Sequence, residues 1–187
     1  MHAKPFPESD GSAIWMSEQE IESFIECAPH EKGEIALHLC SLGLRVAEVA
    51  KLTNDRRYKD EEGDYWLRVH GKGDKERRTP LPKKLALVNL ELGVTARTIQ
   101  NWCKAAGEEY HRRNPSVDEA LLISCHDLRR SWAGHLLQGD GETSGVDPLI
   151  VMEWGGWESF EVFRTFYINV ASPDWQRKER AKIARLN

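Results

Sequence analysis

The stretch His126-Asp127-Leu128-Arg129-Arg130 opens a segment in which apolar side chains recur at helical spacing. This periodicity predicts a helix over residues 126–137. His126 and Arg129 are three residues apart, so a helix projects them from one face. A proton-transfer group beside a fixed cation favours a site for an anionic group, most simply a phosphate. The motif His-x-x-Arg is short, and a helix-start histidine beside a surface arginine is the alternative interpretation.

The composition is that of one globular domain with a real core. The 187 residues are 40% hydrophobic and 30% charged, with a net charge of −4. The charge does not by itself indicate a nucleic-acid partner, and the basic stretches are local, at residues 72–78 and 177–185. The four cysteines form no Cys-x-x-Cys pair, which favours reduced, buried thiols over a metal site. No run of apolar residues is long enough for a membrane span, so we expect a cytoplasmic, nucleoid-associated protein.

The rest of the chain predicts a mainly α fold with a small antiparallel β-hairpin or sheet. Residues 1–16 are expected to be a flexible lead-in, residues 17–172 the main domain, and residues 173–187 a basic helix or tail. The alternation over residues 65–70 and the glycine-rich turn that follows predict a hairpin with a lysine at its tip. Residues 54–64 are expected to form a loop. Helices are predicted over residues 17–28, 31–42, 46–52, 85–92, 96–110, from 147 onward, and over 159–167.

Further segments could each contribute chemistry, and each has a purely structural alternative. Arg45 lies among apolar residues with Glu48 three positions later, which fits either an anchored functional cation or a plain structural pair. Lys72 lies between two glycines on a thin turn, which suits a proton donor but also fits an ordinary charged turn. Trp157 and Tyr167 would usually be core residues. The stretch over residues 92–102 also fits the turn and recognition helix of a helix-turn-helix.

Taken together and in order, these motifs resemble the catalytic domain of the tyrosine recombinases, the phage-integrase family. The resemblance covers residues 15–167 and includes a Glu-Trp-Gly-Gly-Trp run typical of archaeal or archaeal-virus members. It rests on these five segments: Gly43-Leu44-Arg45-Val46-Ala47-Glu48, Gly71-Lys72-Gly73-Asp74-Lys75-Glu76-Arg77, His126-Asp127-Leu128-Arg129-Arg130, Gly156-Trp157, and Tyr167.

The resemblance implies cleavage and rejoining of duplex DNA through a 3′-phosphotyrosyl intermediate, in integration, excision or inversion, without a metal or other cofactor. Arg45 and Arg129 would hold the phosphate, and Tyr167 would attack it. Lys72 would protonate the leaving oxygen, with Lys75 as the other candidate. His126 would take the proton of the tyrosine, Trp157 would donate a hydrogen bond to the phosphate, and Glu48 would support these residues. The residues that would contact DNA are Arg77, Arg97, Thr98, Gln100, Asn101 and Arg130.

The implied partners are double-stranded DNA and further copies of the chain, assembled as a tetrameric synapse. Residues 1–16 are too few to form the family's DNA-clamping N-terminal domain. Two alternatives remain: a helix-turn-helix-like DNA-binding regulator with vestigial catalytic residues, and a type IB topoisomerase-like nicking-closing enzyme.

Overall fold

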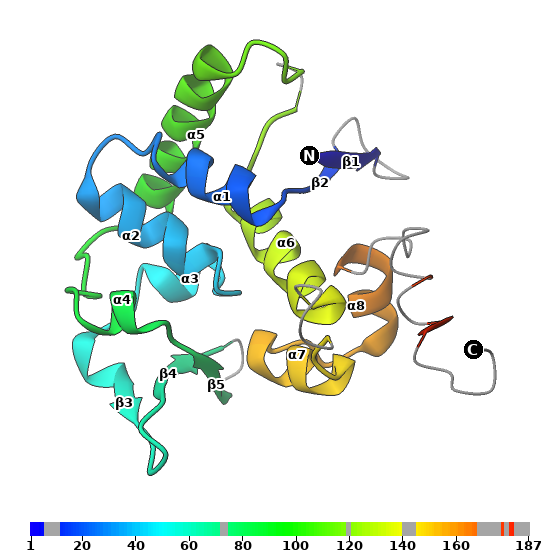
Figure 1. The fold of residues 1–187 in the computed structure, drawn as a ribbon. Helices are drawn as coiled ribbons and strands as arrows, with labels where there is room; N and C mark the ends of the chain where they lie inside the picture. Colours follow the sequence, from blue (N-terminus) through cyan, green and yellow to red (C-terminus); the bar gives the residue numbers. More distant parts are fainter. Residues whose placement is uncertain are drawn as a thin grey trace.

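The structure, a computed structural model, describes residues 1–5, 12–71, 75–118, 121–139, 145–167, 177, 180 and 181, with only the backbone at 166 and 167. Figure 1 shows α6 crossing the middle of the molecule between a helical body with a small sheet and the pair α7 and α8. The elements are β1 (His2–Pro5), β2 (Ser12–Trp15), α1 (Glu18–Ile25), α2 (Glu31–Cys40), α3 (Val46–Val49), the 3-10 helix η1 (Asn54–Arg56), β3 (Arg57–Lys59), β4 (Tyr65–His70), β5 (Glu76–Pro80), α4 (Lys83–Ala86), α5 (Ala96–Arg113), α6 (Cys125–Gln138), α7 (Pro148–Gly155) and α8 (Phe160–Tyr167).

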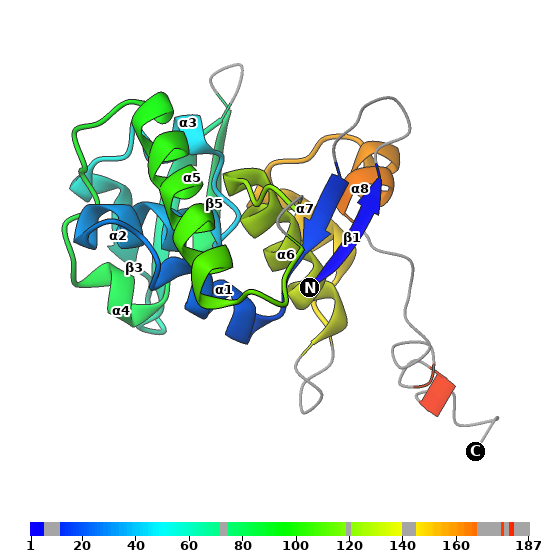
Figure 2. The ribbon, with the colours of Figure 1, turned by 90° about the horizontal axis from the view of Figure 1, so that it is seen from above.

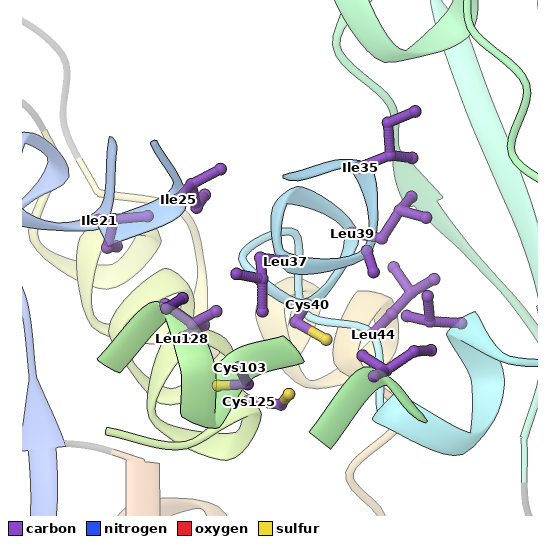
Figure 3. Close-up of a cluster of buried hydrophobic side chains, with 14 of the residues drawn as sticks. Ile21, Ile25, Ile35, Leu37, Leu39, Cys40, Leu44, Cys103, Cys125 and Leu128 are labelled. Carbon is purple, nitrogen blue, oxygen red and sulfur yellow. The ribbon is translucent and has the colours of Figure 1, made fainter. Parts of the chain in front are cut away.

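The main core lies where α1, α2, α5 and α6 meet. α2 packs against both α5 and α6, and α1 packs against α5. The side chains of Phe24, Leu37 and Leu128 are completely buried there, and Figure 3 shows part of this cluster. Burial of each such side chain contributes about 1.5–3 kcal/mol. A second cluster joins α6 to α7 and α8, so α6 belongs to both halves of the core.

The two strands of the predicted hairpin are β4 and β5 of a three-stranded antiparallel sheet with the order β3-β4-β5. The prediction of a loop over residues 54–64 is wrong, because this segment contains η1 and β3. β3 is short and polar, so it carries no alternating apolar signal. It is held instead by tertiary contacts: Arg68 stacks over the Tyr58 ring at 4.6 Å, and Arg57 donates to Val88 O at 2.7 Å.

The N-terminal segment also differs from the flexible lead-in that we expected. β1 and β2 form an antiparallel ribbon, and Figure 2 shows it lying beside α6. Ile14 N donates to Asp127 Oδ1 at 3.0 Å, and Met16 N donates to Ser131 Oγ at 2.9 Å. Both Ile14 and Met16 are buried. The ribbon is therefore fixed by polar groups of α6 that the local sequence of residues 1–16 does not reveal.

The helix ends follow the predicted caps more closely than the predicted lengths. Ser17 forms the expected capping box with Glu20, and Asp147 caps α7 ahead of Pro148. α4 is shorter than the helix predicted over residues 85–92. Of the predicted basic tail, residues 177, 180 and 181 alone are described, and the remainder lies outside the described residues. No helix in the described part of the chain has the length and apolarity to cross a membrane.

We expect Asp127→Ala to lower the free energy of unfolding by about 3–5 kcal/mol, because it removes the buried carboxylate that contacts Arg130. It also removes the acceptor of Ile14 N and of Ser124 N. Urea denaturation followed by circular dichroism measures the change. The matched control is Glu108→Ala, whose pair with Lys104 spans 3.8 Å and is exposed, with an expected cost below about 1 kcal/mol. Equal costs for the two variants would contradict this account of Asp127.

Candidate active site

The site is built around the buried carboxylate of Glu48, in α3. Arg45 precedes this helix as its N-cap, and Arg45 N donates to Glu48 Oε2 at 2.7 Å. Arg45 Nη1 donates to Glu48 Oε1 at 2.9 Å. From β5, Arg77 Nη1 and Nη2 donate to the two carboxylate oxygens at 3.0 and 2.9 Å. One carboxylate therefore orients two guanidinium groups from distant parts of the chain.

The charges in this cluster compensate one another. Burial alone would raise the pKa of Glu48, but the positive charge of Arg77 and the hydrogen bonds from Arg45 and Arg77 outweigh it, so its pKa is lowered. Burial lowers the pKa of Arg77, while Glu48 acts in the opposite direction. The side chain of Arg45 is 38% exposed, against 6% for Glu48. Arg45 is thus the member of the cluster that presents its charge to solvent.

The carboxyl end of α7 supplies a second set of acceptors. Arg45 Nη2 donates to Gly156 O at 2.9 Å, and Arg77 Nε donates to Trp154 O at 2.8 Å. Gly156 ends the helix in the left-handed conformation, at φ 71°. The last carbonyls of a helix carry its partial negative charge and have no partner within the helix. The turn after α7 therefore places carbonyl groups where they bind the arginines.

Arg129 is held on the same turn and covered by Trp157. Its Nη2 donates to Gly155 O at 2.7 Å, and its Nη1 donates to Gly43 O. The guanidinium lies over the Trp157 ring, with Cζ 4.1 Å from the ring centroid. Phe163 of α8 packs against Trp157 at a centroid distance of 4.8 Å. Arg129 is completely buried, whereas the sequence motif predicts a phosphate-facing cation.

His126 stands near the start of α6 on the exposed side of the helix. Its pKa is lowered to about 4, first by desolvation and then by the positive charges of Arg130 and Arg129. The residue is exposed, so the two arginines are a firmer cause than burial. Both effects act in the same direction, and the imidazole is neutral at neutral pH. A neutral imidazole can accept a proton, and the neighbouring cations make this one a weaker base than a free histidine.

A hollow of about 700 Å³ opens between β5 and the segment joining α7 to α8. Arg45, Lys75 and Trp157 line it, and Lys75 Nζ lies 2.6 Å from Glu158 Oε1 at its exposed rim. Lys72 lies outside the described residues. The backbone places residue 167 at the end of α8, four positions after Phe163, and the Tyr167 side chain is likewise not described.

The predicted DNA-contacting residues separate into two groups. Arg97, Gln100 and Asn101 are exposed on α5, and Thr98 N is engaged with the Thr95 cap at 3.2 Å. Arg77 and Arg130 do not share this surface. Both are buried in ion pairs, with Glu48 and Asp127 respectively, and their surface assignment does not fit the structure. The three-residue spacing of Asp127 and Arg130 could have revealed their pairing, but no local signal links Arg77 to Glu48.

Among the described residues, no group of three or more His, Cys, Asp or Glu side chains is arranged to hold a metal ion. Polar chemistry at this site comes from guanidinium groups, an imidazole and a lysine.

Sequence comparison finds relatives among bacterial recombinases. A 121-residue segment is 36% identical to tyrosine recombinase XerC of Neisseria gonorrhoeae, covering 58% of this chain and 39% of that protein. Tyrosine recombinase XerC of Chromobacterium violaceum is 28% identical over 154 residues, covering 75% of this chain and 50% of that protein. The chain is similar in sequence to tyrosine recombinases. It spans half or less of the length of these two relatives, and no protein-family model matches it.

Solved structures of a recombinase and a transposon integrase share the fold. XerA recombinase superposes with a TM-score of 0.65 at 19% identity, over 91% of this chain and 65% of that one. The Tn1549 transposon integrase, solved with transposon right-end DNA, superposes with a TM-score of 0.66 at 16% identity, over 96% of this chain and 69% of that one. The fold is that of a tyrosine recombinase catalytic domain, as the sequence motifs predicted.

We expect Gly155→Ala to destabilise the protein by about 1–3 kcal/mol through overpacking. A Cβ at this position would lie 1.9 Å from Trp157 Cζ3, so the ring that covers Arg129 must move. The control is Gly107→Ala in α5, where the nearest atom, Phe24 Cε2, is 3.9 Å away and alanine should stabilise the helix by up to about 1 kcal/mol. Thermal denaturation compares the two. A Gly155→Ala protein as stable as the control would refute the packing role of Trp157.

We expect His126 to titrate with a pKa of about 4, below its ordinary value of 6.5. Since the unfolded chain binds this proton more readily than the folded one, protonation favours unfolding as the pH falls from 6.5 toward 4. Imidazole C–H signals followed by NMR measure the midpoint, with His126→Gln to assign the signal. A midpoint at or above 6.5 would contradict the electrostatic description of the site.

Proposed function

We propose that this chain is the catalytic domain of a site-specific DNA recombinase that cleaves and rejoins duplex DNA through a 3′-phosphotyrosyl intermediate. The observation that carries the proposal is the convergence of two arginines at the end of α7. Arg45 and Arg129 both bind carbonyls there, and Arg129 lies over the Trp157 ring. Relatedness to the tyrosine recombinases supports the same reaction.

The arginines are proposed to bind the scissile phosphate. Arg45 already faces the hollow, and its fork is fixed by Glu48 and Gly156 O. A planar fork with parallel N–H groups suits the non-bridging oxygens of a phosphate better than an ammonium does. Arg129 is covered by Trp157, so we propose that entry of DNA moves the indole aside. The indole ring then leaves its present position over Arg129, and its N–H donates to the phosphate.

Tyr167 is proposed as the nucleophile. In support, Tyr167 follows Phe163 by four positions in α8, and Phe163 packs against Trp157. The neutral imidazole of His126 accepts a proton at the phosphate site. Lys72 is proposed to protonate the departing 5′ oxygen, with Lys75 as the alternative because it lines the hollow.

Duplex DNA and further copies of the chain are the proposed partners. Arg97, Gln100 and Asn101 offer an exposed polar face on α5 for DNA. Large apolar side chains are exposed on α7 and α8, which supports self-association in a tetrameric synapse; they are Leu149, Ile150, Phe160 and Val162. An archaeal or viral origin, a mobile element and nucleoid association remain predictions, and the two relatives compared above are bacterial.

The test is a covalent trap. The protein is incubated with a pool of nicked duplexes of randomised sequence, in which cleavage releases a short strand and prevents rejoining. We expect a detergent-resistant protein–DNA adduct that Tyr167→Phe abolishes, because phenylalanine has no hydroxyl. Arg45→Lys should reduce adduct formation by about 100-fold, because one fixed fork at the developing charge is lost.

The matched control is Tyr65→Phe, which changes a tyrosine of β4 away from the hollow and should leave the adduct unchanged. Recovered DNA gives the site for strand-exchange assays. Joined products from two duplexes support recombination, while relaxation of supercoiled DNA without exchange would favour a nicking-closing enzyme. Tight binding without any adduct would exclude catalysis and favour the regulator.

A further inference from the structure

Three of the four cysteines gather at the start of α6, each from a different helix. Cys40 ends α2, Cys103 lies in α5, and Cys125 is the first residue of α6. Figure 3 shows the three side chains close together at one end of the hydrophobic cluster. All three are buried, and none forms a disulfide. Cys125 directly precedes His126 in the sequence, yet the proposed phosphate chemistry uses none of the three thiols.

Cys103 and Cys125 are also open to a cavity. A hollow of about 740 Å³ between α5 and the segment leading into α6 is lined by both residues, and Cys40 does not reach it. Its lining also holds the charged residues Arg97, Lys104, Glu108 and Arg112 and the exposed apolar side chain of Leu122. Cys103 and Cys125 are both buried, so this cavity is the side from which a small molecule would reach them. Positive charge near a thiol favours the thiolate.

The surroundings activate one thiol of the pair. Hydrogen bonds from the thiols of Cys103 and Cys40 lower the pKa of Cys125 to about 4, while Cys125 raises the pKa of Cys40 and of Cys103. The amino end of α6 acts in the same direction on Cys125, because its N–H groups favour negative charge. Cys27 differs, since burial raises its pKa and its Sγ donates to Ser23 O at 3.2 Å.

We propose that Cys125 and Cys103 form a thiol modification site that a small hydroperoxide oxidises to a disulfide. In the first step the Cys125 thiolate attacks the terminal peroxide oxygen and the O–O bond breaks. The sulfur becomes a sulfenic acid, and the alkoxide or hydroxide that leaves is the reduced product. In the second step the Cys103 thiol attacks the Cys125 sulfur, the S–O bond breaks, and one water is released as the S–S bond forms.

The disulfide would act on the neighbouring site. Cys125 precedes His126 and follows the N-cap Ser124, so a bond to α5 draws the first turn of α6 toward the cavity. This displaces His126 relative to Arg129. Oxidation therefore reduces DNA cleavage, an effect that rests on the proposed function, whereas the thiol chemistry itself does not.

The test uses the full reduced chain and hydrogen peroxide, with free thiols counted and peptides mapped by mass spectrometry. We expect two of the four thiols to be lost, in one Cys103–Cys125 linked peptide pair that a reductant restores. Cys125 should react about tenfold faster than Cys27, as its thiolate character requires. In Cys103→Ser, oxidation should stop at a sulfenic acid on Cys125, which a 1,3-diketone traps. In Cys125→Ser, none of the remaining thiols should be lost.

The control variant is Cys27→Ser, which should behave as the parent protein because Cys27 lies outside the cavity. Native circular dichroism of each variant before oxidation verifies that it is folded. Cys125 reacting no faster than Cys27 would overturn the proposal, as would a sulfenic acid without a disulfide in the parent protein. Because these measurements involve no DNA, their outcome does not depend on whether the chain is a recombinase.

Discussion

The buried carboxylate of Glu48 is the constraint on which the site depends. Its two oxygens accept hydrogen bonds from Arg45 and from Arg77, which bring α3 and β5 together. Removing one partner from such a buried ion pair typically costs about 3–5 kcal/mol, because it leaves an uncompensated charge. The cost makes the arrangement rigid. Arg45 consequently keeps one fixed orientation at the edge of the hollow although its own side chain is partly exposed.

The turn after α7 completes the arrangement with backbone rather than side-chain groups. Carbonyls at residues 154–156 accept hydrogen bonds from three arginines, which come from α3, β5 and α6. Helix-terminal carbonyls are suited to this because they lack partners in the helix and carry partial negative charge. The glycines allow the approach: any side chain at Gly155 would occupy the space of the Trp157 ring. The geometry around Arg129 thus depends on a short loop and one aromatic ring.

The opening motif of the sequence divides its residues between two tasks. Asp127 and Arg130 are structural, since their buried pair ties α6 to the N-terminal ribbon. His126 and Arg129 are the proposed site residues, one on the exposed side of α6 and the other beneath Trp157. Cys125 adds a thiol at the same helix start. A single helix terminus therefore carries residues of the core, of the candidate site and of the cysteine cluster.

The sequence by itself determined the local structure and the order of the motifs. Helix caps such as Ser17 and Asp147, the alternation in β4, and the pairing of Arg45 with Glu48 depend on residues a few positions apart. Tertiary structure alone decided that Arg77 is buried against Glu48, that β3 and the N-terminal ribbon form, and that Trp157 covers Arg129. These contacts join residues from distant parts of the chain, so their energy comes from burial and hydrogen bonds that no local window contains. The periodicity of the chain could predict that α6 carries His126 and Arg129 together, but only the packing of α7 and α8 determines how far each side chain is exposed.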